Sequence, residues 1–209
     1  MNYKKLKVIL IISASLFLAA CKTTGEFTGD ANLTILVVDE NGSGVGNCSV
    51  ILSNFNKSEN GITNENGMCV FSNVPSGEFR LTGQKNGYSK LESEPFNFIN
   101  KGDIFCFEIF SSGQILTKVE QLYEQRDYKN ASELLDQVVC DKKSSLYAAI
   151  CLYKSYGFFL QENKKQTLSE LKKMKKADKS FEEIYEKIIQ KIEINEIENE
   201  SQEGEGETL

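Results

Sequence analysis

Residues 58–71 read SENGITNENGMCVF, an oxygen-rich stretch with two Glu-Asn-Gly triplets that runs into four strand-forming residues. A third triplet occupies residues 40–42. Such triplets suit hairpin turns, because Asn and Gly tolerate positive φ, and they also occur in calcium-binding loops. An EF-hand loop needs Asp at alternate positions and a bidentate Glu, whereas residues 68–71 offer no oxygen ligand. The pattern therefore favours turns over a metal site.

Further strand-like segments surround this stretch and alternate with Gly- and Asn-rich turns. The expected strands cover residues 33–38, 48–52, 68–71, 79–84, 96–99 and 104–110. Short strands at nearly regular spacing are typical of an all-β sandwich. The sequence therefore predicts an antiparallel β-sandwich over residues 32–111.

Three runs of this half share a recognisable pattern: VDENGSGVGNCSVIL from Val38, GITNENGMCVF from Gly61 and VPSGEFRLTGQKNGY from Val74. They resemble the carboxypeptidase regulatory-like domain. The matching positions are Asp39, Gly42, Val50, Thr63, Gly67, Pro75, Gly77, Leu81, Gly87 and Tyr88. The departures are Gly44-Val45, Asn47, Asn64 and Phe79. The resemblance implies a transthyretin-like β-sandwich that serves as a non-catalytic accessory module.

Residues 112–195 change to a helical period. Helices are expected to begin near residues 113, 127, 144, 165 and 180, with Asp127 or Asn130 capping the second. The third, over 144–160, is apolar on nearly all sides and should be central, with Gly157 loosening its end. The run Ser180-Phe181-Glu182-Glu183 has the form of a capping box for the fifth helix.

Helices of this length with short loops favour antiparallel hairpins. The run LYEQRDYKNASELLDQV, from Leu122 to Val138, resembles one tetratricopeptide repeat through Tyr128, Ala131 and Leu135. A weaker second register follows about 36 residues later, at Thr167, Leu171 and Met174. The resemblance implies a repeat-like helical domain, and a generic helical bundle is the alternative. The candidate residues of a partner groove are Leu122, Tyr123, Tyr147 and Tyr153.

The chain begins MNYKKLKVILIISASLFLAAC, with three lysines ahead of an apolar run over residues 8–20. The run suits a signal-peptide core and is too short to span a bilayer. Its end, Leu-Ala-Ala-Cys at 18–21, resembles the lipobox of bacterial lipoproteins; an ordinary secretory signal is the alternative. The resemblance implies a signal peptide over 1–20, lipidation of Cys21 and a tether over 21–31. Lys22, in place of Asp, favours the outer membrane over the inner.

Composition narrows the function classes. Residues 1–20 hold three of the 24 Lys and Arg and none of the 30 Asp and Glu, so removing them changes the net charge from −6 to −9. Such a charge does not suit nucleic acid or an anionic membrane surface. The chain has no histidine, so Ser-His-Asp, Cys-His and His-zinc mechanisms are excluded.

Five cysteines follow Cys21, and no CxxC pair occurs among them. A thioredoxin-type or zinc-ribbon site is therefore not expected. Cys140 and Cys151 are candidates for a disulfide across a helix–helix turn, since disulfides form outside the cytoplasm. Burial of these cysteines as small apolar side chains is the alternative.

Charge is segregated toward the C-terminus. Seven lysines crowd the fourth expected helix and its flanks: Lys164, Lys165, Lys172, Lys173, Lys175, Lys176 and Lys179. From Glu193 onward seven glutamates occur with no Lys or Arg, which predicts a disordered acidic tail over residues 196–209. The lysines are expected to form a solvated face, and an acidic partner or the tail is the alternative reading.

No group of Ser, Cys, Asp or Glu has the spacing and the base that an active site needs. We therefore predict a non-enzymatic, lipid-anchored scaffold of the cell envelope. It would use no metal or cofactor, bind no nucleic acid and hold a protein partner on its helices. The alternative is a lipoprotein that binds glycan or a small molecule through loops 40–47, 54–66 and 85–95, with Phe55 and Tyr88 as aromatic contacts. An enzyme is the least favoured reading.

Overall fold

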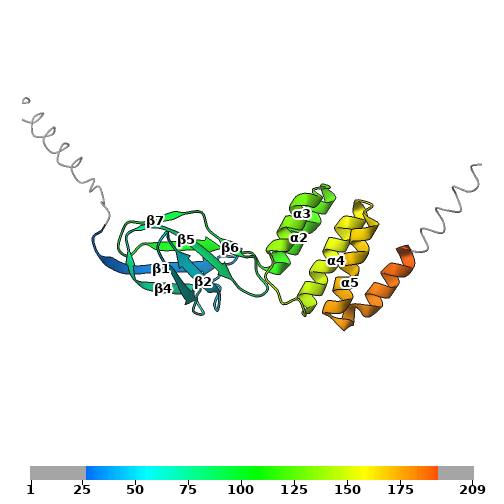
Figure 1. Ribbon diagram of the computed structural model, residues 1–209, viewed down its shortest axis with the longest axis horizontal. Coiled ribbons are helices and arrows are strands. Elements are labelled where there is room, and N and C mark those ends of the chain that lie inside the picture. The colour runs from blue at the N-terminus through cyan, green and yellow to red at the C-terminus, as the bar shows by residue number, and fades with distance from the viewer. Residues whose placement is uncertain (1–26, 193–209) are drawn as a thin grey trace, which may run out of the picture.

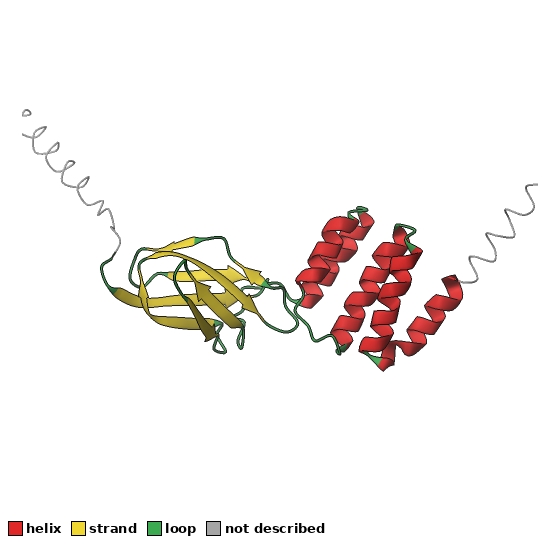
Figure 2. Cartoon of the chain, viewed as in Figure 1, coloured by secondary structure: helices red, strands yellow, loops and turns green. Residues whose placement is uncertain are grey.

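The computed structural model of the protein describes residues 27–192, in which a β-sheet domain is followed by helices (Figure 1). The two parts lie one after the other along the long axis of the molecule, as Figure 2 shows by secondary structure. Cys21, the signal-like segment and the acidic tail lie outside the described residues. Within residues 27–192, no helix combines the length and the apolar character that crossing a membrane requires.

Two sheets form the β domain. One has the order β4 (Met68–Pro75), β1 (Asp30–Val38), β8 (Ile104–Glu108), with β1 antiparallel to β4 and parallel to β8. The other has the order β3 (Ser58–Ile62), β2 (Ser49–Ser53), β5 (Gly77–Gln84), β6 (Leu91–Glu92), and β7 (Phe96–Phe98) also pairs with β5. All six expected strands are confirmed. The parallel β1–β8 pair corrects the expectation of a purely antiparallel sandwich.

The core of the β domain lies between the two sheets. Along β1, Leu33, Ile35 and Val37 are fully buried while their neighbours are partly exposed, which is the period of two that a half-buried strand requires. They share one hydrophobic cluster with Val50 of β2 and Leu81 of β5. Along β1, the inward-facing side is therefore the one that carries these alternate apolar residues.

The first triplet of SENGITNENG is a strand and not a turn, which corrects the sequence reading. Residues 58–62 form the edge strand β3, in which Gly61 pairs with Val50. A Cβ on Gly61 would lie 2.4 Å from the Cys69 Sγ and 3.1 Å from the Phe71 ring. Glycine is therefore required by close packing, although Glu, Asn and Gly are poor strand formers.

The other two triplets form the turns that the sequence predicts. The Asp39 carboxylate accepts hydrogen bonds from the amides two and four residues ahead, both at 2.9 Å. The Asn64 side-chain oxygen does the same, both at 3.0 Å. Gly42 lies three residues after Asp39 and has a φ of +75°, and Gly67 lies three residues after Asn64 and has a φ of +77°. An Asx side chain thus holds the loop in each case.

The helices are α2 (Ser112–Glu124), α3 (Tyr128–Gln137), α4 (Ser145–Leu160), α5 (Lys164–Ala177), the 3-10 turn η1 (Lys179–Phe181) and a helical segment over 182–192. Asp127, one of the two expected caps, accepts from the Asn130 amide at 3.2 Å. The capping box expected at Ser180 is wrong. Asp178 provides the cap, because its carboxylate accepts from the Ser180 amide at 2.9 Å and the chain already turns at Lys179.

The pairs α2/α3 and α4/α5 form two helical hairpins joined by matching loops. Arg126 and Glu162 have φ of +60° and +58°, and each precedes a capping residue, Asp127 or Asn163. The buried positions Ala131, Leu135 and Val138 of the first hairpin recur 36 residues later as Thr167, Leu171 and Met174. The two hairpins therefore share a loop conformation and a spacing of buried residues.

A small set of backbone pairings joins the β domain to the first hairpin. Residues 87–90 lie between residues 110–112 and residues 137–139. On one side the Ser89 amide donates to the Phe110 carbonyl, and on the other the Lys90 amide donates to the Gln137 carbonyl, both at 2.8 Å. The hairpin therefore follows the β domain without a long free linker.

Candidate partner groove

A groove of about 850 Å³ opens between α2 and α4, near the loop that joins α2 to α3. Residues of both helices and of the two hairpin loops line it. They are Glu120, Tyr123, Glu124, Arg126, Tyr128, Leu152, Tyr153, Tyr156, Leu160 and Glu162. Four of these ten side chains are tyrosines, so the groove offers aromatic faces together with hydroxyl groups.

Tyr123 forms the centre of the groove wall. Its hydroxyl donates to the Tyr153 carbonyl oxygen at 2.8 Å, and its ring centroid lies 6.2 Å from that of Tyr128 and 5.7 Å from that of Tyr156. Burial raises the pKa of Tyr123 to about 12, so the hydroxyl stays a neutral donor. The hydrogen bond fixes the ring between the two hairpins.

Gly157 of α4 makes room for this ring. A Cβ at position 157 would lie 2.6 Å from the Tyr123 hydroxyl oxygen and 2.9 Å from its ring. The sequence led us to expect that Gly157 loosens the end of the helix. The helix instead continues to Leu160, and the glycine serves the close approach of Tyr123.

The rim of the groove is acidic. Glu120, Glu124 and Glu162 carry exposed carboxylates, and Arg126 is the one cation among the lining residues. The Tyr153 hydroxyl donates to a Glu120 carboxylate oxygen at 2.6 Å, and this bond raises the pKa of Tyr153. Within residues 27–192, Glu124 and Glu162 form no ion pair.

A second hollow of about 390 Å³ adjoins the groove. It lies between α4, α5 and residues 182–192, and Leu152 and Tyr156 line both hollows. Its further lining residues are Ser155, Phe159, Thr167, Ile188, Lys191 and Ile192. Tyr156 and Phe159 are 52% and 49% exposed. Helix α4 is therefore not central on all sides: one face is core and the other lines both hollows.

Two of the four candidate groove residues, Tyr123 and Tyr153, lie in the groove. Leu122 packs on the cluster between α2 and α3, and Tyr147 packs on the cluster of α4 and α5, so neither is among the lining residues. Sequence reasoning missed Tyr156. The sequence did carry a signal for it. Tyr156 lies three residues after Tyr153, and residues three apart lie on the same face of a helix with 3.6 residues per turn.

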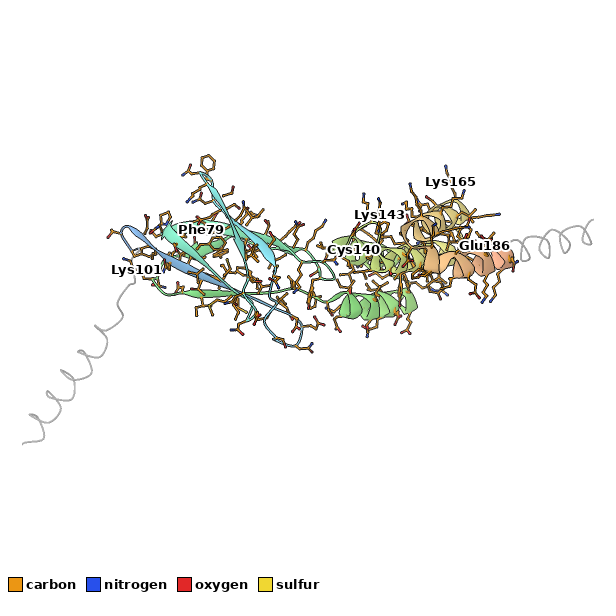
Figure 3. All side chains as sticks on the ribbon, turned by 90° about the horizontal axis from the view of Figure 1, so that it is seen from below. Phe79, Lys101, Cys140, Lys143, Lys165 and Glu186 are labelled. Carbon is orange, nitrogen blue, oxygen red and sulfur yellow. The ribbon has the colours of Figure 1, made fainter. Side chains whose placement is uncertain are left out.

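The Cys140–Cys151 disulfide is not present, and both thiols are free. Cys140 packs with the cluster of the first hairpin, near the end of the helical half that adjoins the β domain (Figure 3). Cys151 is buried in the cluster of α4 and α5. Burial raises the pKa of the Cys151 thiol to about 11, which keeps it protonated and unreactive. The two cysteines therefore belong to different packing units.

The loops of the β domain offer a smaller hollow. It measures about 230 Å³ and is lined in part by Asn54, Asn56, Lys57 and Glu59. Phe55, at the tip of this turn, is fully exposed. Tyr88 is half-buried in the core, and residues 87–90 are paired at the junction. The loops around 40–47 and 85–95 do not line this hollow.

The lysines of α5 are partly engaged within the helical half. Lys173 pairs with Glu170 at 2.6 Å, and Lys175 pairs with Glu182 and Glu186 at 3.0 and 2.8 Å. These pairs raise the pKa of both lysines. Within residues 27–192, no group of three or more Cys, Asp or Glu side chains is arranged to hold a metal ion.

No protein-family model and no curated protein matches the chain. Solved structures similar to it include the Bacillus anthracis TIE protein (18% identity, 40% of this chain and 17% of that chain, TM-score 0.36). BcpA, the major pilin subunit of Bacillus cereus, has 16% identity over 39% of this chain and 29% of its own, with a TM-score of 0.30. Catechol 1,2-dioxygenase from Pseudomonas arvilla has 15% identity over 42% and 54%, with a TM-score of 0.33. The chain thus covers less than two thirds of each protein, and such low, partial similarities carry no functional assignment.

Proposed function

We propose that the protein is a lipid-anchored, non-enzymatic scaffold of a bacterial cell envelope that holds a protein partner in its helical groove. The observation that carries the proposal is the tyrosine-lined groove of about 850 Å³ between the two hairpins. Tyrosine is enriched at recognition surfaces because its ring is large and rigid and its hydroxyl remains polar. The lipobox-like sequence at residues 18–21 supports the anchor.

The repeated hairpin supports the resemblance to tetratricopeptide repeats. Such repeats stack their hairpins to bury a continuous core and use the surface between them for binding. Two hairpins are fewer than a stable array usually needs. In this protein the β-domain junction follows one side of the stack and residues 182–192 pack on the other, so both ends are covered.

The partner is tested by crosslinking in native membranes followed by affinity capture of the full-length chain. We expect wild type and Phe55→Ala to retain the same specific protein. Tyr156→Ala should lose it, because this half-exposed ring lines both hollows and truncating it leaves the buried core in place. Loss in Phe55→Ala together with retention in Tyr156→Ala would assign binding to the β-domain loops and favour the glycan or small-molecule alternative.

The anchor is tested separately by Cys21→Ser. A serine cannot accept the thioether-linked lipid, and each buried CH₂ of an acyl chain contributes roughly 0.8 kcal/mol to membrane binding. We expect the protein to leave the membrane fraction and lose its incorporation of labelled fatty acid. A variant that still fractionates with membranes and still carries the label would refute lipidation at Cys21.

A further inference from the structure

We propose that the occupant of the groove is an extended, cationic peptide segment that alternates Lys or Arg with apolar residues. This inference rests on the proposed scaffold function and names the chemistry of its partner. The groove has two adjoining hollows of about 850 and 390 Å³ that share Leu152 and Tyr156. A single side chain does not fill this space, so several consecutive residues of a partner are needed.

Charge selects a cation for the larger hollow. Three carboxylates and one guanidinium line it, which leaves two negative charges in excess. Glu124 and Glu162 form no ion pair within residues 27–192, so both are available to a partner. Carboxylates bind Lys and Arg, with geometry that favours Arg where two oxygens are reachable.

The tyrosines reinforce this preference. The negative face of a tyrosine ring attracts an ammonium or guanidinium group placed over it. Tyr156 is 52% exposed, and Tyr153 directs its hydroxyl to Glu120, which keeps a carboxylate beside the rings. The larger hollow therefore offers aromatic faces and acidic oxygens to the same cationic side chain.

The smaller hollow selects an apolar neighbour. Phe159, Ile188 and Ile192 line it together with Lys191, and it contains no carboxylate. Residues 193–209, which follow Ile192 in the sequence, have seven glutamates and no Lys or Arg. That charge also favours a basic partner, because opposite long-range charge accelerates encounter.

The chain's own lysines do not crowd the larger hollow. Lys165, Lys172 and Lys176 are exposed on α5, which contributes no lining residue there, and Figure 3 shows the side chain of Lys165 directed outward. No lysine is therefore among the residues that line the larger hollow, where Arg126 is the one cation. A second copy could also present this lysine-rich helix, and the test separates that occupant from a peptide.

The test selects binding peptides from a displayed library of random dodecapeptides, with the detergent-solubilised full-length protein as bait. Only peptides that bind to wild type and not to Tyr156→Ala are analysed further. We expect the kept peptides to be enriched in Lys or Arg next to apolar residues. Their affinity should fall about tenfold in the triple variant Glu120→Gln, Glu124→Gln, Glu162→Gln, since each exposed ion pair contributes a factor of roughly 1.5 to 5. Raising the salt concentration should weaken wild-type binding in the same direction.

The matched control is Glu65→Gln, Glu78→Gln, Glu94→Gln, which removes the same charge from exposed positions of the β domain. We expect this control to bind the peptides as wild type does. Groove-dependent peptides that are neutral or acidic would overturn the cationic occupant and leave the scaffold function standing. If no peptide depends on Tyr156, both proposals fail. If wild type sediments as a dimer that the groove triple variant dissociates, the occupant is a second copy and the peptide proposal is overturned.

Discussion

Glu40 links the β domain to the first helix through a contact that spans 71 residues of sequence. Its carboxylate accepts from the Ser111 hydroxyl at 2.5 Å and from the Ser111 amide at 2.9 Å. Ser111 is the N-cap of α2 and accepts from the Gln114 amide at 3.3 Å. The glutamate of one Glu-Asn-Gly triplet thus orients a helix cap, while its asparagine and glycine complete a turn.

The variant Glu40→Gln should lower the free energy of unfolding at neutral pH by about 1 kcal/mol. A bond to a charged group contributes roughly 1.5–3 kcal/mol when buried, and solvent screening reduces this at a half-exposed site. Urea unfolding of wild type and variant measures the difference. An equally stable variant would show that the Ser111 cap holds without the carboxylate.

The same contact makes stability depend on pH. The Ser111 hydrogen bonds lower the pKa of Glu40 from its ordinary value of 4.5. Because the folded-state pKa is depressed, the stabilisation is fully present above pH 4.5 and is lost as the pH falls toward the lowered value. Unfolding titrations between about pH 3 and 6 should show a shallower loss for Glu40→Gln than for wild type. Parallel curves would contradict this assignment.

Gly157 and Gly113 provide a matched pair of helical glycines. Gly157→Ala should destabilise the protein by about 1–3 kcal/mol and weaken partner binding, because the added methyl group meets Tyr123. Gly113→Ala should be neutral or stabilising by up to about 1 kcal/mol, since beyond its chain neighbours and its own helix backbone the nearest atom to its Cβ is the Ser111 Oγ, 4.0 Å away. Thermal unfolding of both variants tests this. Equal effects would mean that Tyr123 moves aside at no cost.

At the scale of elements, the two Asx-held turns share a hydrogen-bond pattern but differ in packing. A Cβ on Gly67 would lie 2.2 Å from the Val37 carbonyl oxygen, whereas a Cβ on Gly42 meets nothing within 4 Å. Both glycines have positive φ, so both substitutions to alanine are strained. The two turns therefore have the same backbone conformation, but only the turn at Gly67 is packed closely against another strand.

Gly42→Ala should cost about 1–2 kcal/mol, the penalty of a left-handed conformation alone. Gly67→Ala should cost about 3 kcal/mol or more, because a clash with backbone adds to that penalty. Denaturant unfolding at equal protein concentration compares the two. If both variants lose the same stability, the backbone near Gly67 can shift and the turn is not fixed by the sheet.

Helix α4 shows how far an element can be interpreted from its sequence. Its bounds and the Ser144 cap agree closely with the expected 144–160. Its nearly uniform apolar surface predicted a central helix, but Tyr156 and Phe159 face solvent. A uniformly apolar helix has no preferred face, so neighbouring helices decide which side becomes core and which becomes groove.

At the scale of the molecule, the backbone pairings of residues 87–90 join the β domain to the helices. The Lys90 amide donates to Gln137 on the α3 side, and the Ser89 amide donates to Phe110 on the α2 side. Both hairpin ends are thereby hydrogen-bonded to one segment of the β domain. The groove is consequently held at a defined place relative to the β domain.

Lys90→Pro should uncouple the two halves, because it removes the amide that bonds to Gln137. In calorimetry we expect one unfolding transition for wild type and two for the variant, since coupled units melt together. Lys90→Ala keeps the amide and is the control, with one transition. A single transition in Lys90→Pro would assign the coupling to side-chain packing instead.

Part of the hollow's lining could be predicted from local sequence. Tyr123 and Tyr153 were predicted as groove residues, and both line the hollow. Leu122 and Tyr147 share the same helices but face the packing clusters. Successive residues of a helix point about 100° apart around its axis, so neighbours in sequence face different sides. The sequence gives these relative directions, but the packing of the helices decides which side faces the groove. Tyr156 could have been found from its spacing after Tyr153, whereas the acidic rim needed the packed hairpins.

The sequence by itself determined the six expected strands, the positions of the two turns, the approximate bounds of the first four helices and the separation of lysines from glutamates. These features depend on residues within about one turn or one strand of each other, so local backbone and side-chain preferences suffice. Only the tertiary structure decided that residues 58–62 pair as a strand, that Gly157 receives Tyr123 and that Glu40 reaches Ser111. Each depends on contacts between distant segments, whose geometry is set by the packing of sheets and helices on one another.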